Sequence, residues 1–490
     1  MKNIKAILFG LALTVGLVAQ AQEVSPVDFM RLNPYQMKSN IATDLPYTSV
    51  MSLLIGNTSL NIQNTTLRYD NLFEFDEQGK PSVIDLRKFA DGLQKKNFLG
   101  VDADVELFTL YRSIGKGRGM LTFDWGVKVQ GDISCSDGLF KLMAYGNSAF
   151  VGDDNPADID LNLNLKAYRQ FAVGYQHNVN SKLSIGVRAK LLFGLANVKT
   201  QSANVKLFTD PESYALRIRE DINVLGSVPG AIKVQDGGLE TSGGISLKDL
   251  YGNQGFGVDL AAEYHINEHF GVMAAVNDLG FVCWKANNIK LEGQVEDVGQ
   301  FYDNGSFLFT GLDSDELELI MNEEDYRDAF SDSLKMYFPT EFQVADKYFT
   351  RLNANALLRG YYDIDGMNRF IVQAQGMFYE SGFRPAVTVA YNGTFFNTID
   401  VCATYTIAPG SYDNLGLGLA FKLGTFHIYA TTNNLIGCFK PFNTGSMNAQ
   451  VGIVFNMDNN KDKGEAKQPK AKQSKKEKKA EEKQPQKEVE

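Results

Sequence analysis

The chain has 490 residues and a formal net charge of −10, from 48 basic and 58 acidic side chains. This length accommodates one large barrel or two or three ordinary domains. The acidic balance argues against nucleic acid as the main partner of the folded part. Beyond the N-terminus, no apolar run approaches the roughly 20 residues that a transmembrane helix needs.

Residues 1–21 have the pattern of a secretory signal peptide. Lys2 and Lys5 precede an apolar stretch, and the small residues Ala19 and Ala21 fit a cleavage site before position 22. Residues 22–46 are polar and rich in turn-forming residues. We expect them either to lie beneath the folded part or to enter it as a small plug.

The next two segments predict short local structures. Residues 47–69 have the pattern of a first hairpin that turns at Gly56 and Asn57. Residues 83–95 repeat apolar side chains at helical spacing, and Ser82 is placed to cap that helix.

Segments with alternating polar and apolar residues recur from residue 101 onward. Successive side chains of a strand point to opposite faces, so each segment has one apolar and one polar face. Carboxylates that face lipid are costly, and the charged faces are therefore expected to point inward. The predicted lumen-lining residues are Asp102, Asp104, Glu106, Asp124, Lys128, Asp158, Asp160, Lys166, Arg188, Lys190, Asp259, Glu263, Arg369, Arg384 and Asp400.

Residues 367–455 repeat the alternation six times, and short turns such as Asn392-Gly393 separate the segments. Alternating segments of about ten residues joined by short turns are typical of transmembrane β-barrels. A soluble β-sandwich or a lipocalin-like barrel is the alternative. Strand length and the charged opposite face favour an all-β, antiparallel transmembrane barrel over residues 47–457.

Three further segments differ in composition from the barrel pattern. Residues 201–250 are Gly-rich and polar and are interpreted as a long external loop. Residues 296–336 form a second insertion, with an acidic helical pattern at 313–335. Residues 458–490 carry 11 Lys against 8 acidic residues and lack the apolar surface needed to fold alone. This tail is expected to be disordered, and either tethers peptidoglycan or a periplasmic protein or only improves solubility.

The chain lacks the local motifs of an enzyme. The Gly-rich run 115–119 lacks the spacing of a phosphate-binding loop, and Asp153-Asp154-Asn155 lacks the EF-hand pattern. His265 and His269 flank a strand turn, and the four cysteines are widely spaced, so that a disulfide can be neither assigned nor dismissed. We predict no catalytic residue, no cofactor and no metal; a barrel hydrolase would need a Ser or Asp nucleophile beside one of the four His residues.

Several runs of residues are similar to an uncharacterised Bacteroidota family of outer-membrane β-barrels, one of the families of unknown function. The runs are Arg31-Leu32-Asn33-Pro34, 277–284 (NDLGFVCW), 415–419 (LGLGL) and 430–435 (ATTNNL). That family resembles in plan the long-chain fatty-acid transporter barrels of roughly 14 strands, and also barrels that serve type IX secretion. The tail after the last strand departs from the pattern, which leaves the usual terminal aromatic assembly signal in doubt unless Phe455 serves internally.

The resemblance implies an outer-membrane protein that lets a small hydrophobic ligand pass, or binds it, without chemistry. Outer-membrane lipid is the expected surrounding, and nucleic acid is not an expected partner. The alternative is a non-transporting scaffold or an accessory subunit of an envelope or secretion assembly, which the long loops and the charged tail favour.

Overall fold

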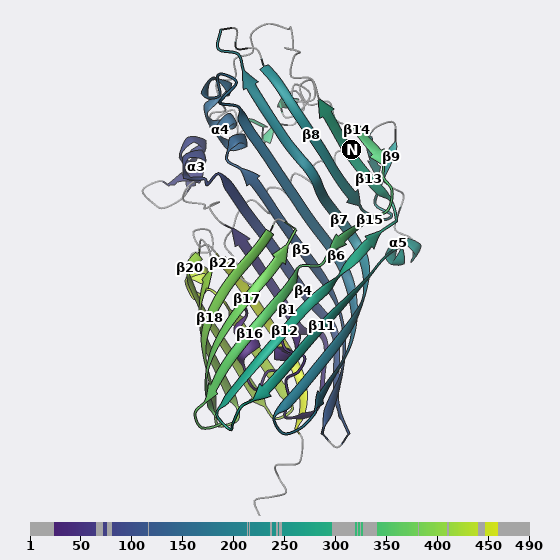
Figure 1. Cartoon of the computed structure of the whole chain (residues 1–490), viewed down its shortest axis with the longest axis vertical. Helices are drawn as coiled ribbons and strands as arrows, with labels where there is room; N and C mark the ends of the chain where they lie inside the picture. Colours follow the sequence, from purple (N-terminus) through teal and green to yellow (C-terminus); the bar gives the residue numbers. More distant parts are fainter. Residues whose placement is uncertain are drawn as a thin grey trace, which may run out of the picture.

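A computed structural model describes residues 24–64, 72–75, 81–115, 117–212, 214, 216–235, 238–241, 244, 247–295, 319–320, 322–323, 325–326, 341–380, 382–408, 411–439 and 446–458. The expected signal peptide, most of the 296–336 insertion and nearly all of the tail lie outside these residues. The described chain forms a closed antiparallel β-barrel of 14 strands, which confirms the predicted fold class (Figure 1).

The barrel closes because β1 pairs with β22 on one side and with β4 on the other. Every neighbouring pair around the ring is antiparallel. In order around the ring the strands are β1 (Tyr47–Asn64), β4 (Lys96–Ile114), β5 (Gly119–Ser136), β6 (Ala157–Asn178), β7 (Leu183–Thr209), β11 (Asn253–His265), β12 (Phe270–Trp284), β16 (Ala354–Asp363), β17 (Asn368–Tyr379), β18 (Gly382–Phe395), β19 (Ile399–Ala408), β20 (Ser411–Leu423), β21 (Phe426–Thr432) and β22 (Ser446–Asp458).

Shorter elements decorate the ring. The additional strands are β2 (Phe73–Phe75), β3 (Pro81–Ile84), β8 (Leu216–Ser227), β9 (Ile232–Gln235), β10 (Gly238–Thr241), β13 (Asn288–Val295), β14 (Glu341–Val344) and β15 (Tyr348–Arg351). The helices are η1 (Pro26–Phe29), η2 (Pro34–Lys38), α3 (Leu86–Gly92), α4 (Gly138–Tyr145), η3 (Asn147–Ala149), α5 (Leu247–Tyr251) and α8 (Leu435–Phe439). Among the described residues, no helix combines the length and the apolar character that a membrane crossing requires.

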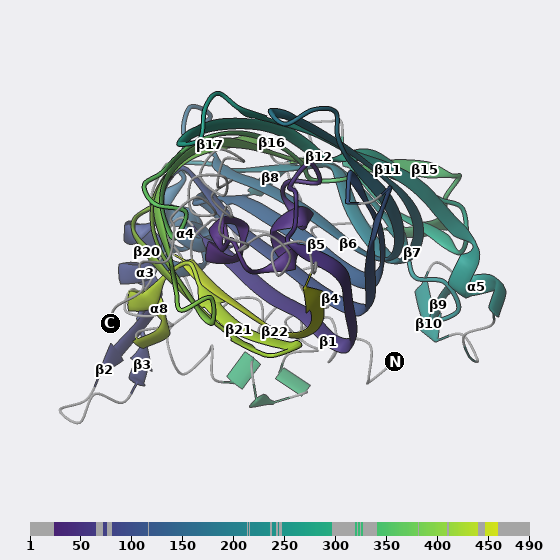
Figure 2. The same cartoon turned by 90° about the horizontal axis from the view of Figure 1, so that it is seen from below.

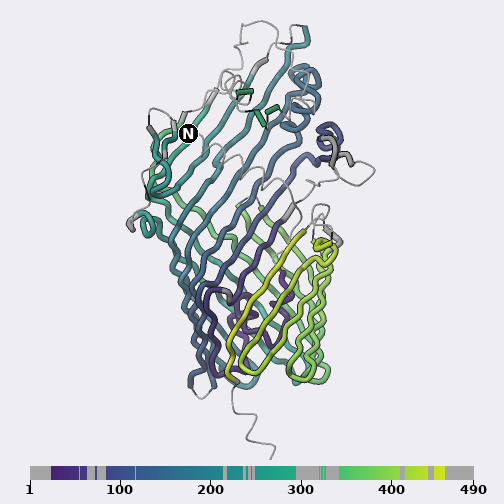
Figure 3. The backbone as a smooth tube through the Cα atoms, turned by 180° about the vertical axis from the view of Figure 1, so that it is seen from behind, coloured from purple at the N-terminus to yellow at the C-terminus, as the bar shows by residue number. Residues whose placement is uncertain are grey.

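The two ends of the barrel differ. Short turns join the strands at the lower end in Figure 1, where Tyr47 of β1 also pairs with Asp458 of β22. At the other end β5, β6, β7 and β8 rise on one side well above the rest of the ring (Figures 1 and 3). We call this part the wall extension. It exists because β7 has 27 residues and pairs beyond the ring with β8, which in turn pairs with β13.

The barrel strands alternate as the sequence predicts. On β17, Phe370 and Val372 point outward and are 53% and 55% exposed, whereas Ile371 and Gln373 point inward and are buried. A continuous apolar outer surface of this kind on a closed sheet is what contact with lipid hydrocarbon requires. Outward aromatic rings also pack on this surface: Trp125 of β5 stacks on Phe171 of β6 at 5.8 Å.

Two local predictions in the N-terminal part were wrong. Residues 47–64 form the single strand β1 and no hairpin; its register shifts between Met51 and Thr58 where β1 faces β22. The Gly56-Asn57 pair therefore marks a β-bulge and not a turn. Helix α3 begins after Asp85, whose side chain caps it by accepting a hydrogen bond from the backbone N–H of Lys88. Ser82 cannot be the cap because it belongs to β3, which pairs with β2.

The prediction of one long loop over residues 201–250 was also wrong. β7 continues to Thr209, and β8, β9, β10 and α5 follow within this stretch. Its Gly-rich composition concealed the strands because β8 and the end of β7 lack a strictly apolar face, which strands beyond the lipid do not need.

Candidate functional site

Residues 24–46, called the plug below, lie inside the lower part of the barrel (Figure 2). Two 3-10 helices make the plug compact. The side chains of Ser25 and Asn33 cap them by accepting hydrogen bonds from Val27 N and Tyr35 N, and each helix has proline at its start. The plug thus carries its own local structure and pairs with no barrel strand.

Glycines on the inner wall let the plug approach the barrel backbone. A Cβ atom at Gly186 of β7 would lie 2.4 Å from the carbonyl oxygen of Ile41. A Cβ atom at Gly418 of β20 would lie 2.9 Å from the side chain of Pro26. The β1 bulge serves the same end, because Gly56 leaves room for the Tyr35 hydroxyl, which hydrogen-bonds Ser52 Oγ at 2.8 Å.

Buried charges hold the plug on one side. Lys38 Nζ at the end of η2 pairs with Glu106 of β4 and lies 3.3 Å from Asp124 Oδ1 of β5. Arg188 of β7 donates through Nη2 to the carbonyl oxygen of Met37 at 2.9 Å. Removal of one partner from such a buried pair costs about 3–5 kcal/mol, since it leaves the other charge uncompensated.

Further ion pairs connect the barrel strands to one another and do not involve the plug. Asp259 accepts from Arg188 at 3.3 Å and from Lys190 Nζ at 2.6 Å. Lys190 also reaches Asp278 at 2.7 Å, and Lys128 lies 3.6 Å from Asp278 and 3.5 Å from Asp104. Positive and negative groups therefore alternate over β4, β5, β7, β11 and β12. This surface is called the charged wall below.

Asp278 belongs to the charged wall although simple alternation predicts an outward side chain. A β-bulge places both Asn277 and Asp278 opposite Asp259, and Asp278 adopts a left-handed backbone with φ 56°. Its N–H donates to Asp259 Oδ1 at 2.8 Å. The signal that could have found it is the Asn-Asp-Leu-Gly run, because Asn and Asp tolerate the left-handed conformation that such bulges use.

Further polar contacts hold the lower part of the plug. Asp400 of β19 accepts a hydrogen bond from Leu32 N at 3.0 Å. Glu263 of β11 accepts from Asn40 Nδ2 at 2.6 Å and from the Tyr361 hydroxyl at 2.8 Å. These hydrogen bonds connect the plug to β11 and β19.

A set of apolar inner side chains also lines the barrel. It packs against buried side chains of the plug that include Val27, Phe29 and Met30. Its barrel members include Ala261, Met273, Ala275, Leu357, Ile371, Ala390, Cys402, Ala420, Tyr429 and Val454. We call it the apolar wall. Buried polar residues such as Gln373, Thr388 and Thr404 lie between these apolar ones. The plug's apolar side chains cover the apolar wall.

Opposite sides of the barrel touch at the upper end of the lumen. The rings of Phe98 on β4 and Tyr379 on β17 are 5.7 Å apart, centroid to centroid, although these strands face each other across the ring. The Arg384 guanidinium of β18 lies 3.9 Å from the centre of the Phe98 ring. This contact is called the upper pinch.

A second set of contacts closes the mouth beside the upper pinch. Trp284 packs on Gly194 of β7, where a Cβ atom would lie 2.4 Å from its ring, and donates to Thr350 Oγ1 at 2.9 Å. The Tyr348 hydroxyl donates to Asn197 Oδ1 at 2.8 Å. Lys166 of β6 donates to the carbonyl oxygen of Arg351 at 2.7 Å.

The upper pinch and the second set of contacts are together called the upper closure. Between the plug and the upper closure lies a polar cavity of about 160 Å³. Ser25, Asp28 and Lys38 of the plug line it from below, and Asp102 and Gln130 are among the barrel residues around it. The cavity has room for a few water molecules.

The structure separates the fifteen predicted lumen residues into groups. Five contact the plug, namely Glu106, Asp124, Arg188, Glu263 and Asp400. Asp104, Lys128, Lys190 and Asp259 pair among barrel strands, and Asp102 borders the cavity. Lys166 and Arg384 lie at the upper closure, and Arg369 pairs with Asp363 beside the lower turns. Asp158 and Asp160 lie on the wall extension, away from these contacts, because β6 runs beyond the ring (Figure 1).

Sequence reasoning missed the plug's own contribution, above all Lys38, and also Asp278 and Arg359. Arg359 donates to the carbonyl oxygen of Asp28 at 2.9 Å and lies over the Phe29 ring. Among the described residues, no three His, Cys, Asp or Glu side chains are placed to hold a metal ion. All four cysteines are free thiols.

Comparisons with known proteins give one family and several distant structures. A model described as a family of unknown function, DUF5723, matches residues 42–433. No curated protein matches the chain.

Three solved structures are similar over most of the chain. The toluene transporter TbuX of Ralstonia pickettii is 9% identical with a TM-score of 0.39, over 87% of this chain and 94% of its own. The toluene transporter TodX of Pseudomonas putida is 9% identical with a TM-score of 0.37, over 87% and 93%. A FadL homologue of Pseudomonas aeruginosa is 10% identical with a TM-score of 0.41, over 87% and 94%. A likeness this distant says nothing about what the present chain binds.

Proposed function

The chain belongs to the family of unknown function DUF5723, and we propose that it is an outer-membrane barrel through which a small, largely hydrophobic ligand passes, or in which it binds, once the plug has moved. The conformation described above is the closed state of that barrel. Residues 24–46 close it from below and the upper pinch closes it from above.

One observation carries this proposal: apolar side chains of the plug cover the apolar wall inside the barrel. Val27, Phe29 and Met30 occupy the place that a hydrophobic ligand would take. Displacement of the plug exposes an apolar surface inside the barrel, and burial of a ligand there gains about 25 cal/mol per Å² of apolar surface.

The contacts of the plug favour a movable element. It is held by side-chain hydrogen bonds, ion pairs and close packing, and shares no strand ladder with the barrel. Such contacts can be released singly without unpairing the barrel sheet. The proposal therefore requires no rearrangement of the 14 strands.

The distribution of turns suggests the orientation. Outer-membrane barrels place short turns in the periplasm and longer connections outside. The lower end of Figure 1, with the short turns and the start of β1 at Tyr47, is therefore proposed to face the periplasm. Export by the segment 1–21, an origin in Bacteroidota and tethering by the tail after residue 458 stay predictions.

A second candidate function is favoured by the wall extension. β6 and β7 have 22 and 27 residues, whereas β19 on the other side of the ring has 10. A sheet that projects beyond lipid on one side offers a docking surface for another envelope protein. A barrel whose plug never leaves would be a scaffold of this kind.

Cys402 offers a direct test, because it lies in the apolar wall beneath the plug and is fully buried. Replacement of Cys135, Cys283 and Cys438 by serine leaves it as the single thiol. N-ethylmaleimide should then label Cys402 slowly in the parent and at least tenfold faster in Lys38→Gln, which leaves Glu106 without its partner. Added 1-decanol, as an apolar probe, should protect Cys402 in the Lys38→Gln barrel.

The matched control is Lys141→Gln, which removes a surface ion pair with Asp137 on α4 and should leave labelling unchanged. Rapid labelling that 1-decanol does not slow would contradict the binding of a hydrophobic ligand inside the barrel. Equally slow labelling in the parent and in Lys38→Gln would favour the scaffold.

A further inference from the structure

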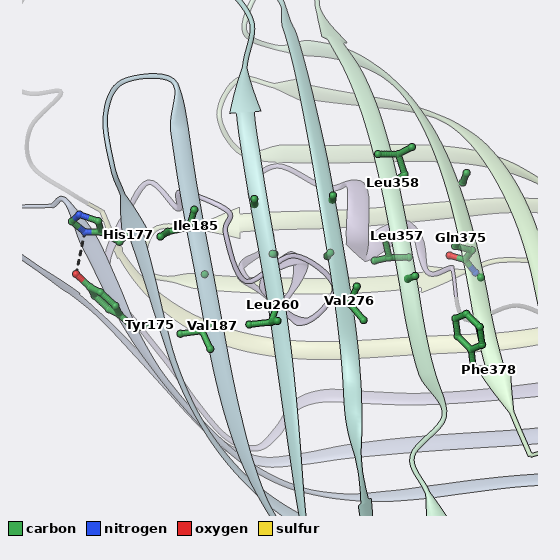
Figure 4. Close-up of a pocket in the computed structure, with 18 of the residues that line it drawn as sticks. Tyr175, His177, Ile185, Val187, Leu260, Val276, Leu357, Leu358, Gln375 and Phe378 are labelled. Atoms are coloured by element: carbon green, nitrogen blue, oxygen red, sulfur yellow. Dashed lines mark hydrogen bonds between the residues drawn. The ribbon is translucent and has the colours of Figure 1, made fainter.

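The outer wall of the barrel carries a groove of about 1010 Å³, on the side that faces lipid (Figure 4). It crosses β6, β7, β11, β12, β16 and β17, and its lining is almost wholly apolar. The outside of a barrel is convex, and bulky side chains normally cover it. A recess of this volume therefore requires a local reason in the sequence.

That reason is a set of small residues on four successive strands. Ala262 pairs with Ala274, and Ala356 pairs with Gly376, all with their faces toward lipid. These small residues form the floor of the groove, and Leu358 and Val187 form its sides. These Ala and Gly positions remove side-chain volume along a continuous line.

The upper end of the groove is closed. The Phe383 ring lies over Gly376, where a Cβ atom would come within 2.5 Å of it, and Phe378 packs against Phe383 at 5.0 Å. Ile185 lies near the start of β7, whereas Gly376 lies past the middle of β17. The groove thus rises obliquely from the short turns toward the centre of the membrane.

The lower end of the groove is polar and cationic. His177 and Tyr175 line it and hydrogen-bond to each other at 3.1 Å. The adjoining turns carry Arg118 and Lys182, both exposed; Asn178 N donates to the carbonyl oxygen of Arg118 at 2.8 Å, which places this turn beside His177. These groups lie at the height where lipid head groups meet a barrel, the level of its aromatic girdle.

The dimensions fit one lipid chain in one leaflet. Six strands about 4.8 Å apart span roughly 24 Å across the sheet. Because barrel strands tilt by about 40°, this line climbs roughly 15 Å along the barrel axis, which is half of a hydrocarbon core of about 30 Å.

We infer that the groove binds one glycerophospholipid, with an acyl chain along Ala262, Ala274 and Ala356 and with its phosphate at His177, Arg118 and Lys182. An anionic head group complements these cations. An acyl chain follows the recessed apolar floor of the groove, whereas the convex wall of a second barrel would not. The assignment to the periplasmic leaflet depends on the orientation proposed above, but the binding itself does not depend on the proposed passage.

Native mass spectrometry of the delipidated full chain tests this with palmitoyl-oleoyl-phosphatidylglycerol as the probe. The parent should retain one lipid per barrel. Ala274→Leu with Ala356→Leu fills the floor and should weaken retention at least tenfold. Ala403→Leu with Ala430→Leu adds the same side chains at exposed outward positions elsewhere and should retain the lipid as the parent does.

The phosphate contact is tested separately. Arg118→Gln with Lys182→Gln should weaken phosphatidylglycerol several-fold and leave a diacylglycerol of the same chains unaffected. Unchanged binding in the filled variant, or no retained lipid in the parent, overturns the site. Equal binding of both lipids by the parent overturns the role of the cations. A parent dimer that the filled variant loses would show that a second copy occupies the groove.

Discussion

Phe98 and Tyr379 lie on strands at opposite sides of the ring, yet their rings are 5.7 Å apart. An open lumen would keep them a barrel diameter apart. The wall that carries Phe98 therefore leans across the upper opening, and Arg384 completes the contact from β18. Together with the plug, this upper pinch encloses the polar cavity.

Phe98→Ala is expected to weaken the upper pinch, because it removes both the ring pair and the surface on which Arg384 rests. The substitution of a buried Phe costs about 3 kcal/mol. We expect a lower unfolding midpoint in urea and faster entry of small solutes from the upper side. Phe281→Ala is the control: its ring pairs with Phe349 at the same 5.7 Å but on the outer surface, so solute entry should not change.

Gly186→Val is expected to unseat the plug, since its Cβ atom would strike the backbone of Ile41. The barrel should stay folded, because the valine side chain enters the space of the plug and not the strand ladder. Labelling of Cys402 by N-ethylmaleimide should rise at least tenfold. Gly360→Val, at a β16 position where a Cβ atom meets nothing within 4 Å, should leave labelling at the parent rate.

Val389→Arg tests which surface touches hydrocarbon. Val389 is 49% exposed on the outer face of β18, and arginine near mid-membrane costs about 2–4 kcal/mol in a barrel. Leu161→Arg is matched, because Leu161 is 40% exposed but lies on the wall extension. Urea unfolding of both variants in phospholipid vesicles should show a loss for Val389→Arg alone; equal losses would place the extension in lipid.

Acid is expected to loosen the upper closure through Glu380, in the turn after β17. Burial raises the pKa of Glu380, but Lys199 at 3.2 Å and a hydrogen bond from Arg351 N outweigh it, so the pKa lies below the ordinary 4.5. A lowered carboxyl pKa stabilises the closure above the ordinary value, and this stabilisation disappears as the pH falls through the lowered pKa.

In a Gly186→Val barrel the upper closure should be the remaining barrier. Its conductance should therefore rise between about pH 5 and about pH 3, and Glu380→Gln should be more open already at neutral pH. A conductance that is flat over this range in the Gly186→Val barrel would show that Glu380 does not hold the closure.

The sequence predicted the barrel because alternation with period two is a property of each strand by itself. The outward Phe370 and Val372 and the inward Asp259 and Lys190 follow from that period alone. It failed where a bulge changes the period, as at Asp278 and in β1. A bulge adds one residue and reverses the faces, and alternation cannot signal this.

The site was harder to predict because its halves are far apart in the chain. Lys38 meets Glu106 and Asp124, and Asp400 meets Leu32, only after the ring has closed around the plug. No local pattern in residues 24–46 shows which inner residues they will contact. The upper pinch likewise joins Phe98 and Tyr379, which are far apart in the chain.

Conductance in planar lipid bilayers tests the central claim most directly, with the parent compared with Gly186→Val combined with Phe98→Ala. The parent should show no sustained conductance. The double variant should open a steady pore, because it removes both closures of a preformed lumen. A parent that conducts steadily, or a folded double variant that stays silent, would contradict the claim.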